Sequence, residues 1–495
     1  MNWRSRHGLR IALLLGALFA AGVIAERGSA FVPLRFAIQR DPALMPSTRS
    51  LPAAEVVSGL PTVSLYVPPR DLYDRDTGIL ANKLEHGREW ERGGTISYFE
   101  DGRLRFSSRV GVRVHGGGTR ITLPEPGFRL FFRRRYGARA TPRGAIFDPP
   151  HDHPLKRLIL HTDVRVDQGL RWHLINPLAY DIARALGGIT PATKPARMFL
   201  NGEFLGVYVL TEHFHERDYF ETHWGHPVRL DGDEFDALWK EIAALPAPRM
   251  RNVSGLVDVE NLTRWVIATI FCATYDPFQG PGQYRDPSRA NAQWFWVNWD
   301  MDWSFRDWRH DTFSGLTERI RERRRARRAS DPRAYLLTRL LAEDPEYRAF
   351  FQRRWVDAFN HHVTPGFLRE RFEHYRAVAI EYGVSDLEYL DRVETFVERR
   401  PAFVRQLAEQ WLNTPPSVRC RVSGSGTVQI DGYLVEPGFE GYYFPGMPIA
   451  LDVPSEFRPR FSHWRINGSV VKAPRTTVAA DRDMEIEAIW TDPST

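Results

Sequence analysis

The sequence predicts an α+β protein that ends in a small all-β domain. Short alternating apolar runs broken by glycine fill the first third of the chain after residue 60, which is typical of strands. Apolar residues then recur at helical spacing over residues 332–412, and short strands with glycine turns follow Pro415-Pro416. The expected parts are a mixed core at 61–331, a helical C-terminal part of that core at 332–414 and a small β domain at 415–495.

Several strands are expected in the mixed core, and one hairpin has a strong local signal. The expected strands are Val63–Val67, Ile96–Phe99, Leu104–Ser108, Val110–Val114, Phe128–Phe132 and Arg157–His161. Asn201-Gly202 separates two apolar runs, 196–200 and 204–210, and Asn-Gly is the dipeptide that a tight two-residue hairpin turn prefers.

Two helices and a second strand pair should follow. Leucine and isoleucine spacing predicts a helix over 170–186, with Pro177 kinking it or marking its true start. Asp258 can cap a second helix, which should stop near Asp276-Pro277. Strands are expected at 283–285 and 293–302.

The first thirty residues have the order of a secretory signal. Arg4, Arg6 and Arg10 precede an uncharged apolar run and a small-residue stretch. We expect residues 1–30 to be a signal peptide or an N-terminal membrane anchor, and residues 31–60 to be a linker. The rest of the chain should therefore be exported and act outside the cytoplasm, in the periplasm, at the cell surface or as a secreted protein.

Charge and cysteine content exclude several classes of protein. The net charge is +6, but Glu318–Arg328 alone carries +5 and residues 1–30 carry +3, which leaves −2 elsewhere. The basic excess is local, so no nucleic-acid partner is expected. Cys272 and Cys420 are too few for a disulfide framework or a cysteine zinc site.

Asp300 and Asp302 are the first candidate site. Residues two apart on a strand share a face, so both carboxylates should point the same way after an aromatic strand. Two such carboxylates suit Mg²⁺ or Mn²⁺, whereas a solvated strand end with two ordinary aspartates is the alternative.

Asp276 follows an apolar helix and is either a turn residue or an acid that orients an acceptor hydroxyl for phosphoryl transfer.

A glycine turn is the second candidate. Gly116, Gly117 and Gly118 follow a strand and permit backbone N–H groups to approach a phosphate, which Arg113 or neighbouring arginines would neutralise. The neighbouring arginines are Arg120 and Arg129. The alternative is a flexible turn in which Arg113, Arg120 and Arg129 are solvated. No Gly-x-Ser-x-Gly, Walker A or Gly-x-Gly-x-x-Gly sequence occurs, which argues against an esterase, a P-loop and a dinucleotide fold.

Two histidine pairs are candidate metal ligands. His151 with His153, and His213 with His215, have a spacing suited to zinc, but no third ligand is evident from the sequence. Glu212 either pairs with a basic residue or is an ordinary surface glutamate.

Five ordered motifs together resemble the CotH kinase family, the spore-coat protein H-like atypical kinases. They are Asp71-Leu-Tyr-Asp-Arg-Asp-Thr-Gly78, Gly87-Arg-Glu-Trp-Glu91, Val112-Arg-Val-His-Gly-Gly-Gly-Thr-Arg120, the stretch from Asn201 to Glu212, and Asn298-Trp-Asp-Met-Asp302. The resemblance implies a distant protein-kinase-like core that binds ATP with Mg²⁺ or Mn²⁺ and phosphorylates protein hydroxyls. Residues 417–490 resemble bacterial surface-repeat β modules, which implies an adhesion or spacer role.

The resemblance also implies roles for single residues. Asp276 becomes the catalytic base, Asp300 the metal ligand and Asp302 an accessory acid, while Arg129 and Glu212 occupy the phosphate-side and ion-pair positions. Two departures are visible: the family's lysine before the position of Arg129 is absent, and its metal-holding asparagine after the aspartate is replaced by Gln279 or Gln283.

The sequence thus favours an exported CotH-type kinase that transfers phosphate from a metal-bound nucleotide to a surface or envelope protein. A degenerate kinase-like structural or binding protein of the cell surface is the alternative, because two family residues are missing and ATP is scarce outside the cytoplasm. A metal-dependent glycosyltransferase is a third hypothesis, since Asp-x-Asp also suits a metal that holds a sugar-nucleotide diphosphate.

Overall fold

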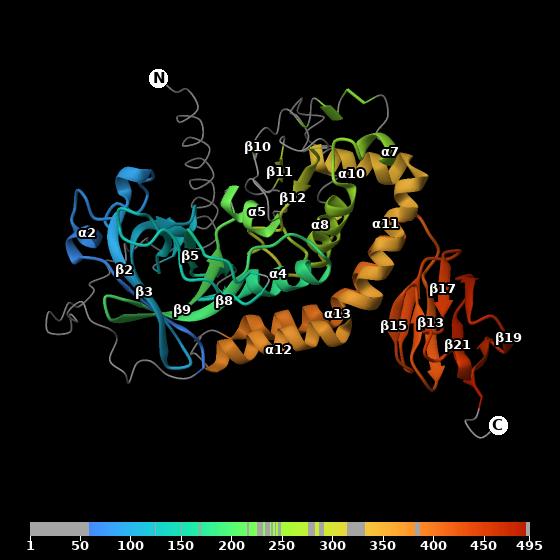
Figure 1. Cartoon of the computed structure of the whole chain (residues 1–495). Helices are drawn as coiled ribbons and strands as arrows, with labels where there is room; N and C mark the ends of the chain where they lie inside the picture. Colours follow the sequence, from blue (N-terminus) through green and yellow to red (C-terminus); the bar gives the residue numbers. More distant parts are fainter. Residues whose placement is uncertain are drawn as a thin grey trace, which may run out of the picture. The chain divides into compact units, whose positions relative to one another are not determined.

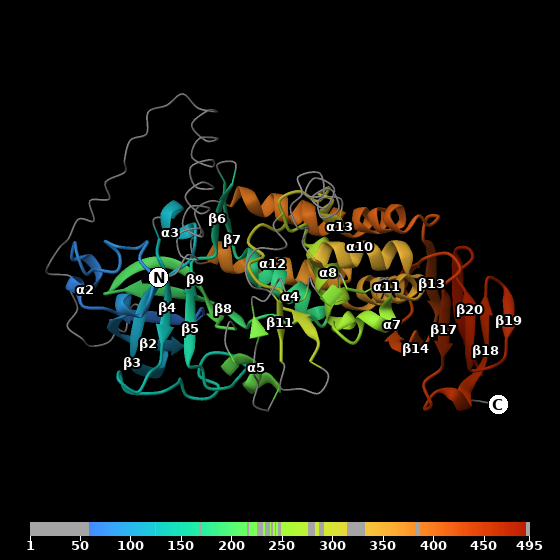
Figure 2. The same ribbon diagram turned by 90° about the horizontal axis from the view of Figure 1, so that it is seen from above.

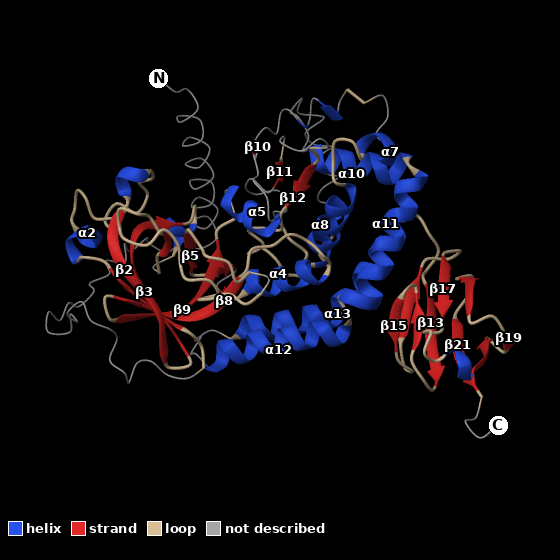
Figure 3. Ribbon diagram, viewed as in Figure 1, coloured by secondary structure: helices blue, strands red, loops and turns tan. Residues whose placement is uncertain are grey.

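The computed structural model describes most of the chain between Gly59 and Thr491 (Figures 1 and 3). Within that span it leaves out residues 124, 150, 168–169, 215–216, 225–230, 233–237, 239–240, 243, 246–248, 276–282, 287–291, 314–331 and 382–386. The expected signal or anchor, the linker and the arginine run therefore lie outside the described residues. The chain divides into two units: residues up to Pro142 with 155–162 and 196–205, and residues 143–154, 163–195 and 206–495.

Seven strands close into a barrel in the order β1-β2-β3-β4-β5-β9-β8. Figures 1 and 2 show them gathered in one group. Neighbours run antiparallel from β1 to β5, whereas β1 and β8 pair in parallel. The strands are β1 (Thr62–Tyr66), β2 (Arg92–Glu100), β3 (Arg103–His115), β4 (Gly127–Phe131), β5 (Arg157–His161), β8 (Thr193–Leu200) and β9 (Glu203–Glu212). The two strands expected at 104–108 and 110–114 are thus one long strand, β3.

The hairpin between β8 and β9 forms as expected. Asn201 and Gly202 have φ values of 52° and 85°, and a turn with positive φ at both positions favours Asn-Gly. The Asn201 side chain also accepts from the Val67 N–H and donates to the Val67 carbonyl, both at 2.8 Å. The turn residue therefore also fixes the end of β1. Smaller elements near the barrel are α2 (Pro69–Tyr73), a 3-10 turn (Arg88–Trp90) and α3 (Thr119–Thr122).

The second unit contains the remaining helices and several short strands. The helices are α4 (Ile175–Ala185), α5 (Arg217–Trp224), α7 (Met250–Val253), α8 (Val259–Phe271), α10 (Pro332–Glu343), α11 (Pro345–Asp357), a π-helical turn (Ala358–His362), α12 (Pro365–Glu381) and α13 (Glu388–Leu412). The strands β6 (Val164–Asp167) and β7 (Leu170–His173) form a hairpin, and β10 (Asp231–Gly232), β11 (Gln283–Arg285) and β12 (Trp294–Trp296) form a small sheet. Among the residues described here, no helix has the length and apolarity to cross a membrane.

Two helix predictions need correction at their ends. Residues 170–173 are strand β7, and α4 begins at Ile175, so Pro177 lies in the first turn, where a helix needs no N–H from it. Helix α8 starts after Asp258 as expected, because the Asp258 carboxylate accepts from the Asn261 N–H at 2.9 Å. It ends at Phe271, earlier than Asp276-Pro277 suggested, since Ala273 takes a left-handed conformation with φ 53°.

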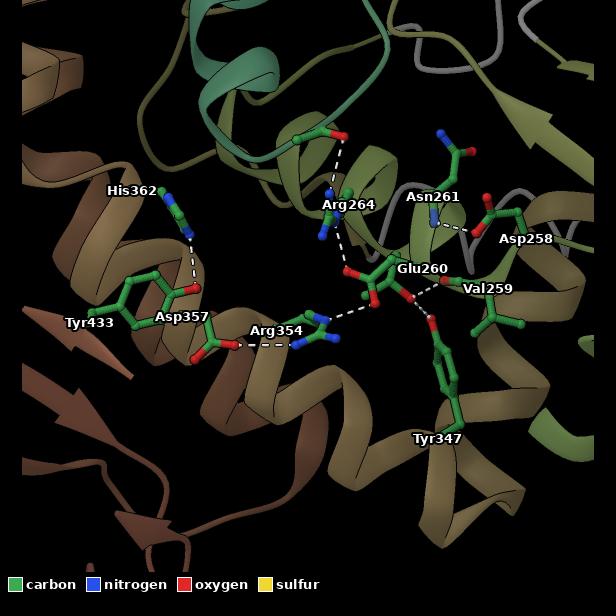
Figure 4. Close-up of polar contacts among 12 residues, drawn as sticks. Asp258, Val259, Glu260, Asn261, Arg264, Tyr347, Arg354, Asp357, His362 and Tyr433 are labelled. Carbon is green, nitrogen blue, oxygen red and sulfur yellow. Dashed lines mark hydrogen bonds and ion pairs between the residues drawn. The ribbon is translucent and has the colours of Figure 1, made fainter. Parts of the chain in front are cut away.

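Helix α8 is tied to α11 by side chains at its first two turns (Figure 4). The Glu260 carboxylate accepts from Arg264 on its own helix at 2.7 Å and from Arg354 of α11 at 2.8 Å. One turn along α8, the Thr263 hydroxyl donates to the Val259 carbonyl and lies 3.0 Å from the Tyr347 hydroxyl. These contacts fix the register between the two helices.

Arg400 of α13 is fully buried and fixes the other end of α8. Its guanidinium donates to the carbonyls of Ile270 and Phe271 in the last turn of α8. It also donates to the carbonyls of Trp308 at 2.7 Å and His310 at 2.8 Å. Because the last carbonyls of a helix have no partner inside that helix, a cation there satisfies them and opposes the helix dipole.

The C-terminal residues form two sheets. One has the order β16-β13-β21-β18-β19 and the other β15-β14-β17-β20. Their strands are β13 (Val418–Gly424), β14 (Val428–Ile430), β15 (Tyr433–Val435), β16 (Glu440–Tyr443), β17 (Pro448–Asp452), β18 (Phe461–Ile466), β19 (Ser469–Val471), β20 (Arg475–Ala479) and β21 (Met484–Trp490). Strands were expected here, while a separate domain of the surface-repeat type stays a prediction.

The π-helical turn Ala358–His362 contacts this region. The Asn360 amide accepts from the Tyr442 N–H at 2.9 Å, and the His362 ring bonds the Tyr433 hydroxyl at 3.1 Å (Figure 4). The His361 ring stacks on Tyr433, with centroids 4.1 Å apart, and on Phe439. Burial lowers the pKa of His361 to about 4, and the charges of His362 and Arg353 act in the same direction.

We expect Arg400→Met to destabilise the protein by at least ~3 kcal/mol, because each buried acceptor that loses its donor costs ~1–3 kcal/mol. The measurement is urea unfolding followed by tryptophan fluorescence. Arg399→Met is the matched control, since Arg399 is the exposed neighbour on the same helix. Equal unfolding free energies in the two variants would contradict this role of Arg400.

We expect His361→Phe to make the fold less sensitive to acid. A histidine whose folded pKa is near 4 stays neutral in the fold but takes up a proton when unfolded below about pH 6.5, so stability falls as pH drops from 6.5 to 4. Phenylalanine keeps the stacking and removes the titration. Melting temperatures at pH 7.5 and 4.5 should differ less in the variant than in the wild type, and an unchanged difference would overturn the assignment.

Candidate functional site

Asp300 and Asp302 do not share a strand face, contrary to the prediction. Strand β12 ends at Trp296, and Asp300 has a left-handed φ of 58°, so the two-residue alternation does not extend to these aspartates. Asn298 is buried and its N–H donates to the Ile189 carbonyl at 2.8 Å. The segment after β12 is therefore a turn, in which the Ser304 N–H donates to the Met301 carbonyl at 3.2 Å.

Helix α4 holds this turn in place. The Asp300 N–H donates to the Tyr180 hydroxyl oxygen at 3.2 Å, and the Met301 N–H donates to the Asn176 side-chain oxygen at 2.8 Å. Asn176 and Tyr180 are four residues apart, so they lie on one face of α4. The amide of Asn176 also donates to the Asp163 carboxylate at 2.6 Å, which adds a third acid to the site.

The three acids influence the same surroundings electrostatically. Burial, opposed by the Asn176 hydrogen bond and assisted by the negative charge of Asp302, raises the pKa of Asp163 to about 7. Burial and then the Asp300 carboxylate raise the pKa of Tyr180 well above its usual value. Asp163, Asp300 and Asp302 thus form an acidic site around Asn176 and Tyr180.

The segment after α8 runs beside this turn. The Phe305 N–H donates to the Cys272 carbonyl at 3.0 Å, and the Tyr275 N–H donates to the Trp303 carbonyl at 3.2 Å. The hydroxyls of Thr274 and Ser304 are 2.9 Å apart. Tyr275 directly precedes Asp276 in sequence, and Trp303 directly follows Asp302. Asp276, the predicted base, and Gln279, a predicted metal ligand, lie outside the described residues.

The glycine turn is braced by the arginines that were predicted to bind phosphate. The Arg113 guanidinium donates to the buried Glu91 carboxylate at 2.8 and 3.1 Å, and Arg133 and Arg135 pair with the same carboxylate. Arg120 folds back onto its own loop and donates to the carbonyls of Val114 and Gly116 and to those of Lys83 and Glu85. Arg113 and Arg120 therefore have structural partners.

Only one of the three glycines is needed for its own conformation. Gly116 has a φ of 107°, and a Cβ there would lie 2.2 Å from the Thr119 hydroxyl oxygen. Gly117 and Gly118 are exposed, and added Cβ atoms would meet nothing within 4 Å. Their backbone is therefore accessible to a ligand.

Arg129 differs from the other two arginines. Its guanidinium lies 3.1 Å from the His115 Nδ1 atom, and its Nε is buried with no hydrogen-bond partner in the described part of the chain. Burial, together with the positive charges of Arg157, Arg120 and Arg113, lowers the pKa of Arg129 to about 10. A buried cation that feels chiefly other cations is stabilised by an anion, so Arg129 is the residue of this set best suited to a phosphate.

Among the residues that the structure describes, Glu212 pairs with histidines and not with a lysine or arginine. Its buried carboxylate bonds His151, His153 and His223 at 3.1, 2.6 and 3.1 Å. Burial would raise the pKa of Glu212, but the three imidazoles hold it far below its usual value. The kinase-like ion pair expected at this position is therefore replaced by a histidine cluster.

The comparisons with known proteins support the resemblance. The profile described as CotH kinase protein matches residues 112–231 and 229–398, which together span more than half of the chain. The chain belongs to the CotH kinase family. No curated protein matches the sequence significantly. The CotH family match covers the glycine turn, Glu212 and the acidic site, whereas the C-terminal sheets lie outside the matched residues.

Sequence reasoning missed three residues of the acidic site in this CotH protein: Asp163, Asn176 and Tyr180. Asn176 and Tyr180 are polar residues on the buried face of an otherwise apolar helix, and that pattern was the available signal. Asp163 follows a barrel strand and has a φ of 46°, a conformation that aspartate tolerates better than most residues. None of the three could be linked to Asp300 without the fold.

We expect Asn176→Ala to destabilise the site and the fold, because it removes a side-chain donor to the Asp163 carboxylate and the side-chain acceptor of the Met301 N–H at once. The cost should be ~1–3 kcal/mol, measured by urea unfolding. Glu398→Ala, at an exposed position of α13, is the control. An unfolding free energy equal to that of the control would show that Asn176 does not hold the two segments.

Proposed function

We propose that this CotH protein is an exported atypical kinase that transfers phosphate from a metal-bound nucleotide, with ATP as donor, to a hydroxyl of a surface or envelope protein. The observation that carries the proposal is the pairing of the Tyr275 and Trp303 backbones at 3.2 Å, beside the Asp163, Asn176 and Tyr180 site. This pairing brings the sequence neighbours of Asp276 and Asp302 together, as phosphoryl transfer requires of a base and a metal-binding acid.

In this proposal the Asp276 carboxylate accepts the proton of the acceptor hydroxyl. The hydroxyl oxygen forms a bond to the γ-phosphorus, the bond from that phosphorus to its bridging oxygen breaks, and the nucleoside diphosphate leaves. Asp276 therefore orients the nucleophile, and no covalent enzyme intermediate is needed.

Asp300 and Asp302 would hold Mg²⁺ or Mn²⁺, with Gln279 in place of the family's asparagine. The residues fit such a cation, because oxygen ligands are those that Mg²⁺ prefers and the neighbouring acid Asp163 is destabilised as an anion by Asp302. When bound, the cation neutralises phosphate oxygens. Within the first unit, Arg129 and the exposed backbone of Gly117 and Gly118 are the candidates for binding an anionic group such as phosphate.

A degenerate structural or binding protein is the second candidate, and a specific observation favours it. Arg113 and Arg120, which the phosphate-binding hypothesis needed, are engaged by Glu91 and by backbone carbonyls. If Arg129 is the one arginine of these three that binds phosphate, the chain would bind nucleotide weakly. Its role would then be to bind other proteins through its surface. Export, the protein acceptor and N-terminal anchoring are parts of the proposal that rest on the sequence.

The direct test is phosphate transfer from labelled ATP in Mn²⁺ or Mg²⁺, by the full chain without residues 1–30. We expect label on protein, and a loss of ~10²–10⁴-fold in Asp276→Asn, the range for a general base. Asp300→Ala should abolish the metal dependence, and Arg129→Ala should raise the KM for ATP. Asp307→Asn, an exposed acid on the same segment, is the control.

Nucleotide binding separates the two candidates. A rise in melting temperature with ATP and Mg²⁺, absent in Asp300→Ala, supports the kinase. No binding at millimolar nucleotide and metal would overturn it and leave the structural role. Release of UDP from a sugar nucleotide would instead indicate a glycosyltransferase.

A further inference from the structure

We propose that His151, His223 and Glu212, with His153 beside them, form a binding site for a transition-metal ion of the Zn²⁺ type, separate from the Asp300 site. The four residues come from three segments of the second unit: the loop before β5, the last residue of β9, and α5. One ligand atom each from His151, Glu212 and His223 lie within 4.8 Å of one another. Neither the kinase proposal nor the family match assigns this group a role.

The geometry places the imidazole nitrogens around one carboxylate. His153 Nε2 and His223 Nε2 lie 2.6 and 3.1 Å from Glu212 Oε1, and His151 Nδ1 lies 3.1 Å from Oε2. In a tetrahedral zinc site with bonds near 2.0–2.1 Å, ligand atoms are ~3.3 Å apart. The nitrogens lie closer than this to the Glu212 oxygens, while the ligand atoms of His151, Glu212 and His223 lie within 4.8 Å of one another, so the side chains would rearrange around a bound ion.

The loop presents its two histidines on the same side. Asp152, between them, pairs with Arg143 at 2.9 Å, so the carboxylate is turned away while His151 and His153 converge on Glu212. Both rings meet His223 edge-on, at interplanar angles of 62° and 85°. Edge-on rings can direct their nitrogens to one point, whereas stacked rings cannot.

The other two ligands are held rigidly. Glu212 exchanges backbone and side-chain contacts with Ala192: the Glu212 N–H donates to the Ala192 carbonyl at 2.9 Å, and the Ala192 N–H donates to Glu212 Oε2 at 3.2 Å. His223 packs on Tyr219, whose hydroxyl donates to the Thr190 carbonyl at 3.0 Å. The site is thus organised before any ion binds.

The environment favours an ion over solvent. Glu212 is 2% exposed, His153 is 9% exposed, and His151 and His223 are 14% and 16% exposed. Within the described residues, the three rings make no hydrogen bond other than those to Glu212, and His153 Nδ1 is buried without a partner. Two imidazoles and one carboxylate are ligand types that Zn²⁺ takes, and His153 lies 2.6 Å from the same carboxylate.

The test is the metal content of the purified full chain after dialysis against Zn²⁺ and then buffer. We expect stoichiometric zinc in the wild type and in the control His463→Ala, on β18, and at least tenfold less in His151→Ala/His223→Ala. Substitution with Co²⁺ should give the visible absorption of tetrahedral coordination. Wild-type protein that retains no zinc, or a double variant that retains it in full, would overturn the proposal.

A second measurement covers a double variant that fails to fold. Wild-type protein treated with a strong chelator should melt at a lower temperature and recover on addition of Zn²⁺ but not of Mg²⁺. A cluster held by hydrogen bonds alone would give the same melting temperature with and without chelator, and that result would refute the site. Neither readout depends on phosphate transfer, so failure of the kinase proposal would leave this test intact.

Discussion

The buried guanidinium of Arg400 is the interaction on which the second unit depends. It satisfies two carbonyls at the end of α8 and two carbonyls of residues 308–310, and no carboxylate could do this because all four groups are acceptors. Burial lowers the pKa of Arg400 only to about 10, so the side chain stays charged at neutral pH. A single cation thereby holds the last turn of α8 against residues 308–310, which follow the acidic turn.

The acidic site follows from that constraint. Once α8 stops at Phe271, the next residues can pair with 303–305 through backbone hydrogen bonds. The opposite side of the turn is held by Asn176 and Tyr180, which contribute neutral polar groups to backbone N–H groups. The backbone of this turn is thus positioned by hydrogen bonds from its N–H groups to α4.

Local chemistry decided which features could be predicted from the sequence. The Asn201-Gly202 turn and the Asp258 cap depend on neighbouring residues, and both formed as expected. The Asp300 and Asp302 pair was placed on a strand face because the aromatic run before it alternates, yet β12 ends at Trp296 and a left-handed residue breaks the pattern. No local pattern encodes contacts between residues that lie tens of positions apart. Such contacts link Asp163 and Asn176 to the acidic turn, and they bring Glu212 and His223 to the loop of His151 and His153.

The two candidate metal sites differ in the type of ligand that they offer. Oxygen donors at Asp300 and Asp302 suit a hard cation, whereas imidazoles together with Glu212 favour a softer ion. Histidines can also satisfy Glu212, which lies at the position where the family resemblance implies an ion pair. A buried glutamate needs either a positive charge or a full set of hydrogen-bond donors, and three histidines can provide one or the other. Because a histidine loses donor capacity when it binds a metal, the ion would replace the charge that a lysine would otherwise bring. Glu212 could then stay buried without the basic partner that the family pattern led us to expect.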